Sequence, residues 1–313
     1  LVGLTEPVRV IQDSFGVPHV YGSTLDDLLF AQGYITASKR LFQMHTLRLA
    51  ASGRLGELLG PGSVSGDVLL RTLKLRDTAE RMATRTKELY PDLYQVLERY
   101  AEGVNSFIAR MNAGDEPKPL EVIVFQSELA PWTPADTLTI VRLQTWDLGF
   151  GGVFSEDELL ERILALQKTF DGSPREGIEA DVYDFTPPAQ TPTVAGKNGV
   201  VEASPTNFKK IIENPFFQKF GIDMWANHAK MSRETLDYPH RMFRSEDFGS
   251  NNWVVSGDHT KSGRPMVAND PHLALRNPAI FFQVHLSDKL AGGDFEVSGV
   301  NFAGSPGIVL GHN

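Results

Sequence analysis

The spacing of apolar residues changes once along this chain, and that change limits the folds open to it. Between residues 25 and 146, apolar side chains recur every three or four positions, as they do on the buried face of a helix. After residue 249 they instead form short runs bounded by glycine, proline and polar turns, which is typical of strands. We therefore expect an α+β fold with a mainly helical first half and an antiparallel sheet near the end.

Residues that favour the first turn of a helix indicate where the helices are expected to begin. Ser23 and Thr24 each precede an acidic residue by three positions, so either could cap a helical region that continues to about residue 60. Pro91 can occupy the first turn of another helix, because proline lacks the amide hydrogen that this position leaves unpaired. The same pattern predicts helices at residues 134–146 and 156–166.

Strands are expected at both ends of the chain. A short one covers residues 8–11, and two runs after residue 249 flank a polar turn, as the arms of a hairpin do. A proline-rich stretch at residues 186–192 has little to bury and is typical of a surface linker. The expected late strands are residues 253–255, 266–268, 281–286, 295–300 and 308–310.

Composition excludes several classes of partner. The chain has 313 residues, with 30 basic and 39 acidic side chains and a net charge of −9, so no overall positive field favours nucleic acid or an anionic membrane surface. The absence of cysteine excludes disulfides and thiolate metal sites. No apolar run approaches the roughly 20 residues that span a bilayer. The first residues lack a signal peptide, so an exported form would have lost it.

Common catalytic motifs are missing. A phosphate-binding loop, a zinc-protease helix motif and the G-x-S-x-G serine motif do not occur, and the eight histidines are scattered rather than set at ligand spacing. ATP chemistry and a histidine zinc site are therefore not expected.

One segment carries a resemblance to a known family. Residues 248–257 read FGSNNWVVSG, and residues 265–273 read PMVANDPHL. Taken alone, Gly-Ser-Asn-Asn fits a polar turn before a buried strand. Together with GSPGIVLGHN at residues 304–313, however, the stretch closely resembles the start of the β-chain of the penicillin acylase family, which are N-terminal-nucleophile hydrolases.

The first half is similar to the α-chain of the same family. The resemblance implies an N-terminal-nucleophile hydrolase αββα sandwich, incomplete here, with an α-chain-like region at 1–186, a spacer at 187–249 and the start of a β-chain at 250–313. The matching stretches are residues 13–20, 33–44, 53–60, 100–105 and 131–136.

The resemblance implies a nucleophile at Ser250, exposed by self-cleavage between Gly249 and Ser250. A serine hydroxyl needs a base, and a freed α-amine with a pKa of about 8 would place one next to it. His272 stands where several members carry a histidine that interacts with this amine, although a core histidine is the alternative. Asn251 could also bond near the nucleophile, but polar residues are common at strand starts.

The resemblance also implies an apolar acyl pocket and a calcium site. Each pocket candidate could equally be ordinary core packing, because aromatic and branched residues fill cores. Glu156 matches a calcium-binding carboxylate of the family, but an acidic residue at a helix start is the alternative. No cofactor is expected for catalysis, and calcium would be structural. The pocket candidates are Trp146, Phe150, Leu273, Val309 and Leu310.

The resemblance implies that this chain is an amidohydrolase acting on a small acyl amide. From the charge balance, neither nucleic acid nor a membrane is expected as a partner. The family's oxyanion donors fall after Asn313, so we expect the remainder of the β-chain as a partner in an α/β heterodimer, and a periplasmic or extracellular location. The substrate stays open between a penicillin-type amide and an N-acyl homoserine lactone. A silent member that serves only as a structural or binding protein is a further alternative.

Overall fold

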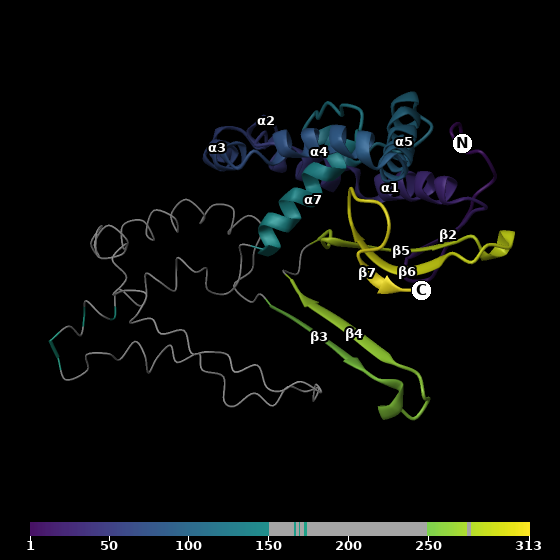
Figure 1. The fold of residues 1–313 in the computed structure, drawn as a ribbon. Helices are drawn as coiled ribbons and strands as arrows, with labels where there is room; N and C mark the ends of the chain where they lie inside the picture. The colour runs from purple at the N-terminus through teal and green to yellow at the C-terminus, as the bar shows by residue number, and fades with distance from the viewer. Residues whose placement is uncertain (150–165, 167–168, 170–171, 174–248, 274–276) are drawn as a thin grey trace. The chain divides into compact units, whose positions relative to one another are not determined.

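The computed structural model describes residues 1–149, 166, 169, 172–173, 249–273 and 277–313. Residues 1–150 and 243–313 belong to one compact unit, so the two ends of the chain fold together. Helices dominate the first part and strands the last, which confirms the mixed helix and sheet content (Figure 1). The predicted boundary between residues 186 and 187 lies outside the described residues. So does the helix expected at residues 156–166, except for its last residue.

The helices follow their predicted start signals. The region expected to run to residue 60 is one long helix and a short one, separated by residues 52–55. The expected helix starts at residues 91 and 134 are confirmed. The helices are α1 (Leu25–Ala51), α2 (Gly56–Leu59), α3 (Val64–Thr72), α4 (Leu75–Leu89), α5 (Pro91–Ala113), α6 (Leu120–Val124) and α7 (Pro134–Gly149), with a short 3₁₀ helix at Pro61–Ser63. In the described part of the chain, no helix is both long and apolar enough to cross a membrane.

A buried carboxylate fixes the start of α1. Thr24, rather than Ser23, caps the helix: its hydroxyl accepts from the Asp27 amide at 3.1 Å and donates to the Asp27 carboxylate at 2.9 Å. The same carboxylate accepts from the amides of Thr5 at 2.8 Å and Glu6 at 3.1 Å. Burial raises the pKa of Asp27, but these hydrogen bonds outweigh it and leave the pKa below its ordinary value of 3.8.

We expect Asp27→Asn to lower the free energy of unfolding by about 2–3 kcal/mol at pH 7, since several hydrogen bonds to a charged, buried group weaken together. Because folding lowers the pKa of Asp27, its carboxylate stabilises the protein fully at pH values above its ordinary pKa of 3.8. This stabilisation is lost as the pH falls through the lower pKa of the folded state. The loss in the variant should therefore shrink below about pH 4. Urea unfolding at pH 7 and pH 3 measures it, with Asp26→Asn in the same turn as the control. An equal loss at both pH values would contradict this account.

Two sheets hold the strands. The first has five strands in the order β1 (Arg9–Gln12), β2 (Pro18–Tyr21), β5 (Phe281–Ser287), β6 (Glu296–Phe302) and β7 (Leu310–His312). The second is the hairpin of β3 (Gly249–Val255) and β4 (Met266–His272). The expectation of antiparallel pairing among the late strands is confirmed for the hairpin and for β5 to β7. The larger sheet also contains a parallel pair that the sequence did not predict. There β2 pairs with β5 in parallel, because a strand from the start of the chain joins strands from its end.

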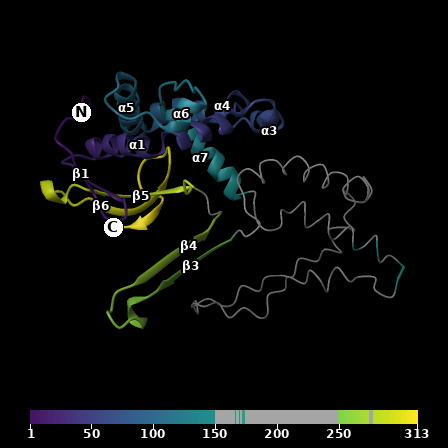
Figure 2. The ribbon, with the colours of Figure 1, turned by 180° about the vertical axis from the view of Figure 1, so that it is seen from behind.

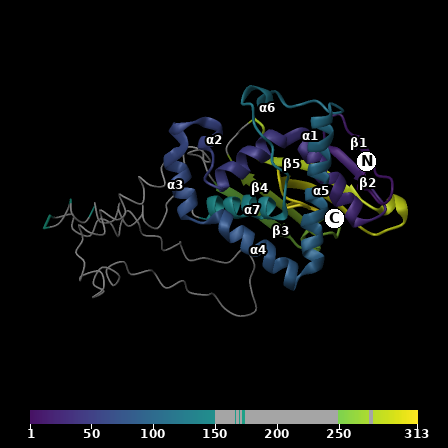
Figure 3. The same ribbon diagram turned by 90° about the horizontal axis from the view of Figure 1, so that it is seen from above.

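Helix α1 covers one face of the five-stranded sheet (Figures 1 and 3). Its apolar side chains pack on those of β2 and β5, and this cluster comprises Val20, Leu28, Ala31, Ile35, Phe282, Val284 and Leu286. The described residues thus include a helical layer on a sheet. The four-layer αββα sandwich stays a prediction.

Helices α1 and α5 approach each other at two glycines. A Cβ atom built on Gly33 would lie 2.1 Å from the carbonyl oxygen of Tyr100, and one on Gly103 would lie 1.9 Å from that of Phe30. Both distances are far shorter than any van der Waals contact. The backbones can therefore come this close only because neither position carries a side chain.

A buried cation ties α1 to the segment before α7. The Arg48 guanidinium donates to the carbonyl of Ala130 at 3.1 Å, lies 3.7 Å from the Asp136 carboxylate and stacks 5.1 Å from the Trp132 ring centre. It also lies 3.1 Å from Nδ1 of the buried His45. Burial, followed by the charge of Arg48, lowers the pKa of His45 from 6.5 to about 4.

This shift predicts a loss of stability in mild acid. The unfolded chain binds a proton at His45 near pH 6.5, whereas the folded chain binds it only near pH 4, so stability falls as pH drops between these values. The loss should reach about 3 kcal/mol. We expect His45→Gln to flatten this part of the stability profile, measured by urea unfolding from pH 7.5 to 4.5. His259→Gln, at an exposed histidine, is the control, and equal slopes in His45→Gln and the parent would contradict the assignment.

Candidate functional site

The predicted nucleophile lies at the open end of the β3–β4 hairpin, drawn in green in Figure 1. Apolar runs form the two arms, and residues 256–265, which include a short 3₁₀ helix at Gly257–His259, join them. A Cβ atom on Gly257 would lie 2.4 Å from the carbonyl oxygen of Gly263, so the turn depends on glycine there. The Thr260 hydroxyl donates to the carbonyl of Arg264 at 2.7 Å and closes the turn. The pairing of the two strands next to the turn sets which residues face each other at the open end of the hairpin.

That register brings the predicted cleavage site and the predicted histidine together. Gly249 pairs with His272, Ser250 with Pro271, and Asn251 with Asp270. Residues directly opposite each other in an antiparallel ladder are cross-strand neighbours on the same face. His272 is therefore the direct neighbour of Gly249, whose carbonyl belongs to the peptide bond predicted to be cut.

The same register separates the imidazole from the hydroxyl. Because side chains alternate along a strand, His272 shares its face with Asn251, while Ser250 shares the opposite face with Pro271. Figure 2 shows the hairpin from behind. In the uncut chain, His272 thus lies beside the Gly249–Ser250 peptide bond and not beside the serine hydroxyl.

Asp270 is a candidate that the sequence reasoning missed. Its carboxylate lies 2.9 Å from Nε2 of His272, and both side chains are exposed. Two residues apart on one strand, they share a face, so the spacing in Asn-Asp-Pro-His was the available signal. The carboxylate can hold the hydrogen on Nε2, which leaves Nδ1 as an acceptor.

The hairpin exposes large apolar side chains on both of its faces. Trp253 is 49% exposed and Val254, its neighbour on the opposite face, is 73% exposed; the facing strand adds Met266 at 50% and Val267 at 61%. A strand in a one-sided sheet would instead alternate apolar and polar residues. Apolar residues on both faces are typical of strands whose two faces are both covered by other layers.

The predicted pocket residues lie on separate elements. Trp146, on α7, is half-buried and packs in a helical cluster with Ala51, Leu70, Leu75 and Leu143. Leu273 directly follows β4 and is half-buried. Val309 is 47% exposed and precedes β7, whose first residue, Leu310, pairs with Val300.

The structure does not test two of the predicted site residues or the predicted calcium site. Phe150 and Glu156 lie outside the described residues. Within the described ranges, no three histidine, aspartate or glutamate side chains gather as a metal site. The expected roles of these residues stay predictions.

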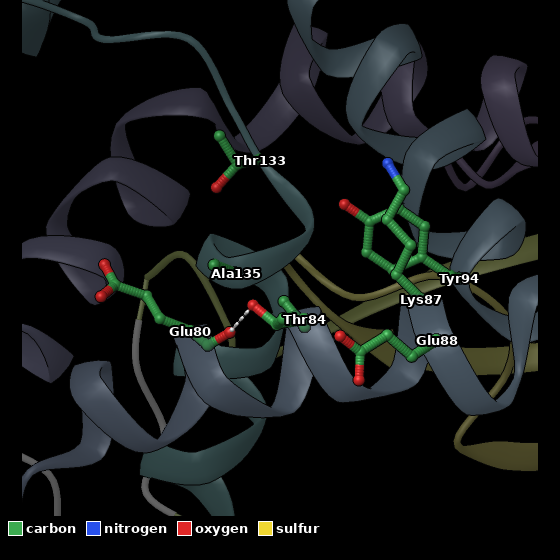
Figure 4. A pocket seen from close by; sticks show the side chains of 8 residues that line it. Glu80, Thr84, Lys87, Glu88, Tyr94, Thr133 and Ala135 are labelled. Atoms are coloured by element: carbon green, nitrogen blue, oxygen red, sulfur yellow. Dashed lines mark hydrogen bonds between the residues drawn. The ribbon is translucent and has the colours of Figure 1, made fainter.

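A groove of about 440 Å³ lies elsewhere, between α4, the start of α5 and the segment before α7 (Figure 4). Glu80, Thr84, Lys87 and Glu88 line it from α4, and the Lys87 ammonium lies 4.9 Å from the Tyr94 ring centre. None of the predicted site residues lines this groove, so it is not the predicted acyl pocket.

Known proteins are similar to this chain over nearly its whole length. The family model described as penicillin amidase matches residues 7–313. The acyl-homoserine lactone acylase QuiP of Pseudomonas aeruginosa is 29% identical over 325 residues, which cover 99% of this chain and 32% of the relative. Penicillin acylase 2 proenzyme of Pseudomonas sp. strain SE83 is also 29% identical, over 98% of this chain and 35% of the relative.

A solved structure supports the fold. The thermostable penicillin G acylase from Alcaligenes faecalis matches with a TM-score of 0.52 and 23% identity, over 62% of this chain and all of the solved chain. This chain spans about a third of the length of the curated relatives that it matches. Since the family match covers almost every residue, the chain belongs to the penicillin amidase family.

Proposed function

We propose that Ser250 is the nucleophile of an amidohydrolase and becomes active when the Gly249–Ser250 bond is cut. The observation that carries this proposal is the register of the hairpin, which sets His272 directly opposite Gly249. The nitrogen of that peptide bond becomes the α-amine after cleavage. A histidine beside it could orient the amine and tune its pKa.

The proposed chemistry needs only water as a second reactant. For maturation, the Ser250 hydroxyl attacks the Gly249 carbonyl, and the C–N bond breaks as the hydroxyl proton passes to the nitrogen, which becomes the free α-amine. Water then hydrolyses the resulting ester, which restores the Ser250 hydroxyl and leaves a carboxylate at Gly249. In turnover the neutral amine takes the proton of the Ser250 hydroxyl, which attacks the substrate amide. The protonated amine then gives its proton to the leaving nitrogen, and water resolves the acyl-enzyme.

Asp270 and His272 act together in this proposal. With Nε2 of His272 directed at the carboxylate, Nδ1 can accept a hydrogen bond from the new amine. Such a bond favours one orientation of the amine near the serine oxygen. Asn251 shares this face and could hold the same region.

The remainder of a β-chain is the proposed partner of the hairpin. Two observations support it: the apolar side chains on both faces of β3 and β4 are exposed, and the chain spans only about a third of its relatives. The rest of the β-chain would pack on these faces and supply the oxyanion donors that the resemblance places after Asn313.

The proposed substrate is an amide with a lipophilic acyl group. Relatives named penicillin acylase and acyl-homoserine lactone acylase both match, so both substrate classes are candidates. A panel of phenylacetyl amides and N-acyl homoserine lactones of increasing chain length would rank them by kcat/KM on the full-length gene product. Free carboxylic acid released from either class supports the proposal, whereas no release from any member would overturn it.

A further inference from the structure

The face of the hairpin that carries Ser250 also carries two asparagine side chains. Side chains two positions apart on a strand point to the same face, so Asn252 shares the face of Ser250. Asn269 pairs with Asn252 across the hairpin and therefore lies on that face as well. The first pair beyond Ser250 on its own face thus consists of two carboxamides, whereas His272 lies on the opposite face.

The surroundings of this asparagine pair leave its hydrogen-bonding groups to a partner outside the hairpin. Both asparagines are exposed, and neither side chain makes a hydrogen bond within the described residues. The next pair along the face is apolar, with Val254 at 73% and Val267 at 61% exposed. If the rest of the β-chain covers these valines, the adjacent carboxamides lose water, which costs free energy unless another group takes their hydrogen bonds.

The register places both carboxamides within reach of a molecule that reacts at Ser250. Cα atoms two positions apart on a strand are separated by about 6.6 Å, so Asn252 is that far from Ser250. Asn269 is diagonal to Ser250, at about 7–8 Å. A substrate atom a few bonds from the attacked carbon fits between the serine hydroxyl and the two carboxamides.

The chemistry of a carboxamide indicates which substrate atom this is. Its NH₂ group offers two donors and the side chain has no charge, so it suits a neutral carbonyl oxygen. A carboxylate would instead favour arginine or lysine, whose charge strengthens the hydrogen bonds. Penicillins and N-acyl homoserine lactones share such a carbonyl: in both, the carbon that carries the acylated nitrogen is bonded to a ring carbonyl.

We propose that Asn252 and Asn269 donate hydrogen bonds to this ring carbonyl and so select the leaving amine. The inference rests on the proposed function of Ser250, and it assigns the two asparagines a role in specificity rather than in bond cleavage. It predicts a preference for amides whose amine carries a carbonyl on the neighbouring carbon. The preferred length of the acyl chain should not depend on these residues.

The test compares two substrates that differ only in the ring carbonyl. One is an N-acyl homoserine lactone, and the other is the amide of 3-aminotetrahydrofuran with the same acyl chain. The ratio of their kcat/KM values is measured on the full-length gene product and on variants of it. We expect Asn252→Ala and Asn269→Ala each to lower this ratio about fivefold, since each removes one neutral hydrogen bond. Comparing ratios cancels the different reactivity of the two amines and any loss of folded enzyme.

A matched control and a conservative variant complete the design. Gln283→Ala removes an exposed carboxamide from β5 and should leave the ratio unchanged. Asn252→Asp keeps the size of the side chain but only accepts hydrogen bonds, so it should lower the ratio as well, and it replaces Asn252→Ala if that variant does not fold. A ratio that stays at the parent value in the asparagine variants would overturn the inference. If the parent hydrolyses neither substrate, the proposed function fails, and the inference fails with it.

Discussion

Ser250→Ala is expected to abolish amide hydrolysis by the full-length protein. The hydroxyl is proposed to attack both its own peptide bond and the substrate, so this single change removes maturation and turnover together. Loss of a covalent nucleophile lowers kcat by about 10⁶-fold in a well-studied serine hydrolase. Acid release from the best amide of the panel should therefore fall to background, while Ser262→Ala in the turn of the same hairpin should retain activity.

A cysteine at the same position sharpens this test. Residues 1–313 contain no cysteine, so Ser250→Cys introduces the only thiol in this part of the protein, and alkylation of the peptide that carries it can be followed by mass. We expect Ser250→Cys to retain some cleavage and to lose its activity on alkylation. Activity that survives in Ser250→Ala would instead point to another nucleophile in the protein.

Gly103→Ala is expected to lower the free energy of unfolding by about 3–5 kcal/mol. The added methyl would lie 1.9 Å from the Phe30 carbonyl oxygen, and a backbone atom cannot rotate away as a side chain can. The two helices must separate, and the core between α1 and α5 loses contacts along its length. A loss of this size is a large share of the 5–15 kcal/mol that typical domains possess.

The direction of the stability change distinguishes the close approach of the helices from helix propensity alone. Alanine is favoured over glycine in a helix by about 1 kcal/mol, so without the close approach Gly103→Ala would stabilise the protein. Gly62→Ala is the matched control, because its Cβ would meet no atom within 4 Å. Urea unfolding of the two variants beside the parent measures both effects. Equal small changes in the two variants would refute the described packing of α1 on α5.

Local signals in the sequence account for most of the elements. Pro91 and Pro134 open helices because proline suits the first turn, and Thr24 caps α1 with a hydroxyl that reaches a free amide. The hairpin follows from two apolar runs around a polar turn. Each of these features is decided by residues within a few positions of one another.

Contacts between distant segments could not be predicted in the same way. The parallel pairing of β2 with β5 joins residues about 266 positions apart, and strand pattern alone does not name a partner. The glycines at 33 and 103 look unfavourable within helices until the crossing of α1 and α5 is seen. The same pairing of β2 with β5 sets His19 opposite His285.

The candidate site was predicted from resemblance rather than from local pattern. Gly-Ser-Asn-Asn fits an ordinary turn, and only the series of matching segments pointed to Ser250. The structure adds the register that sets His272 opposite Gly249, and it adds the Asp270 carboxylate at the imidazole. It gives Trp146 helical neighbours, so the acyl pocket still rests on the resemblance.

N-terminal sequencing of the purified full-length gene product tests the central claim most directly. We predict a chain that begins Ser250-Asn251-Asn252 in the parent protein and is absent from Ser250→Ala, with intact masses that sum to the uncut protein plus one water. A parent protein that stays in one piece, or a new terminus at another residue, would contradict the role of Ser250 as a self-exposed nucleophile.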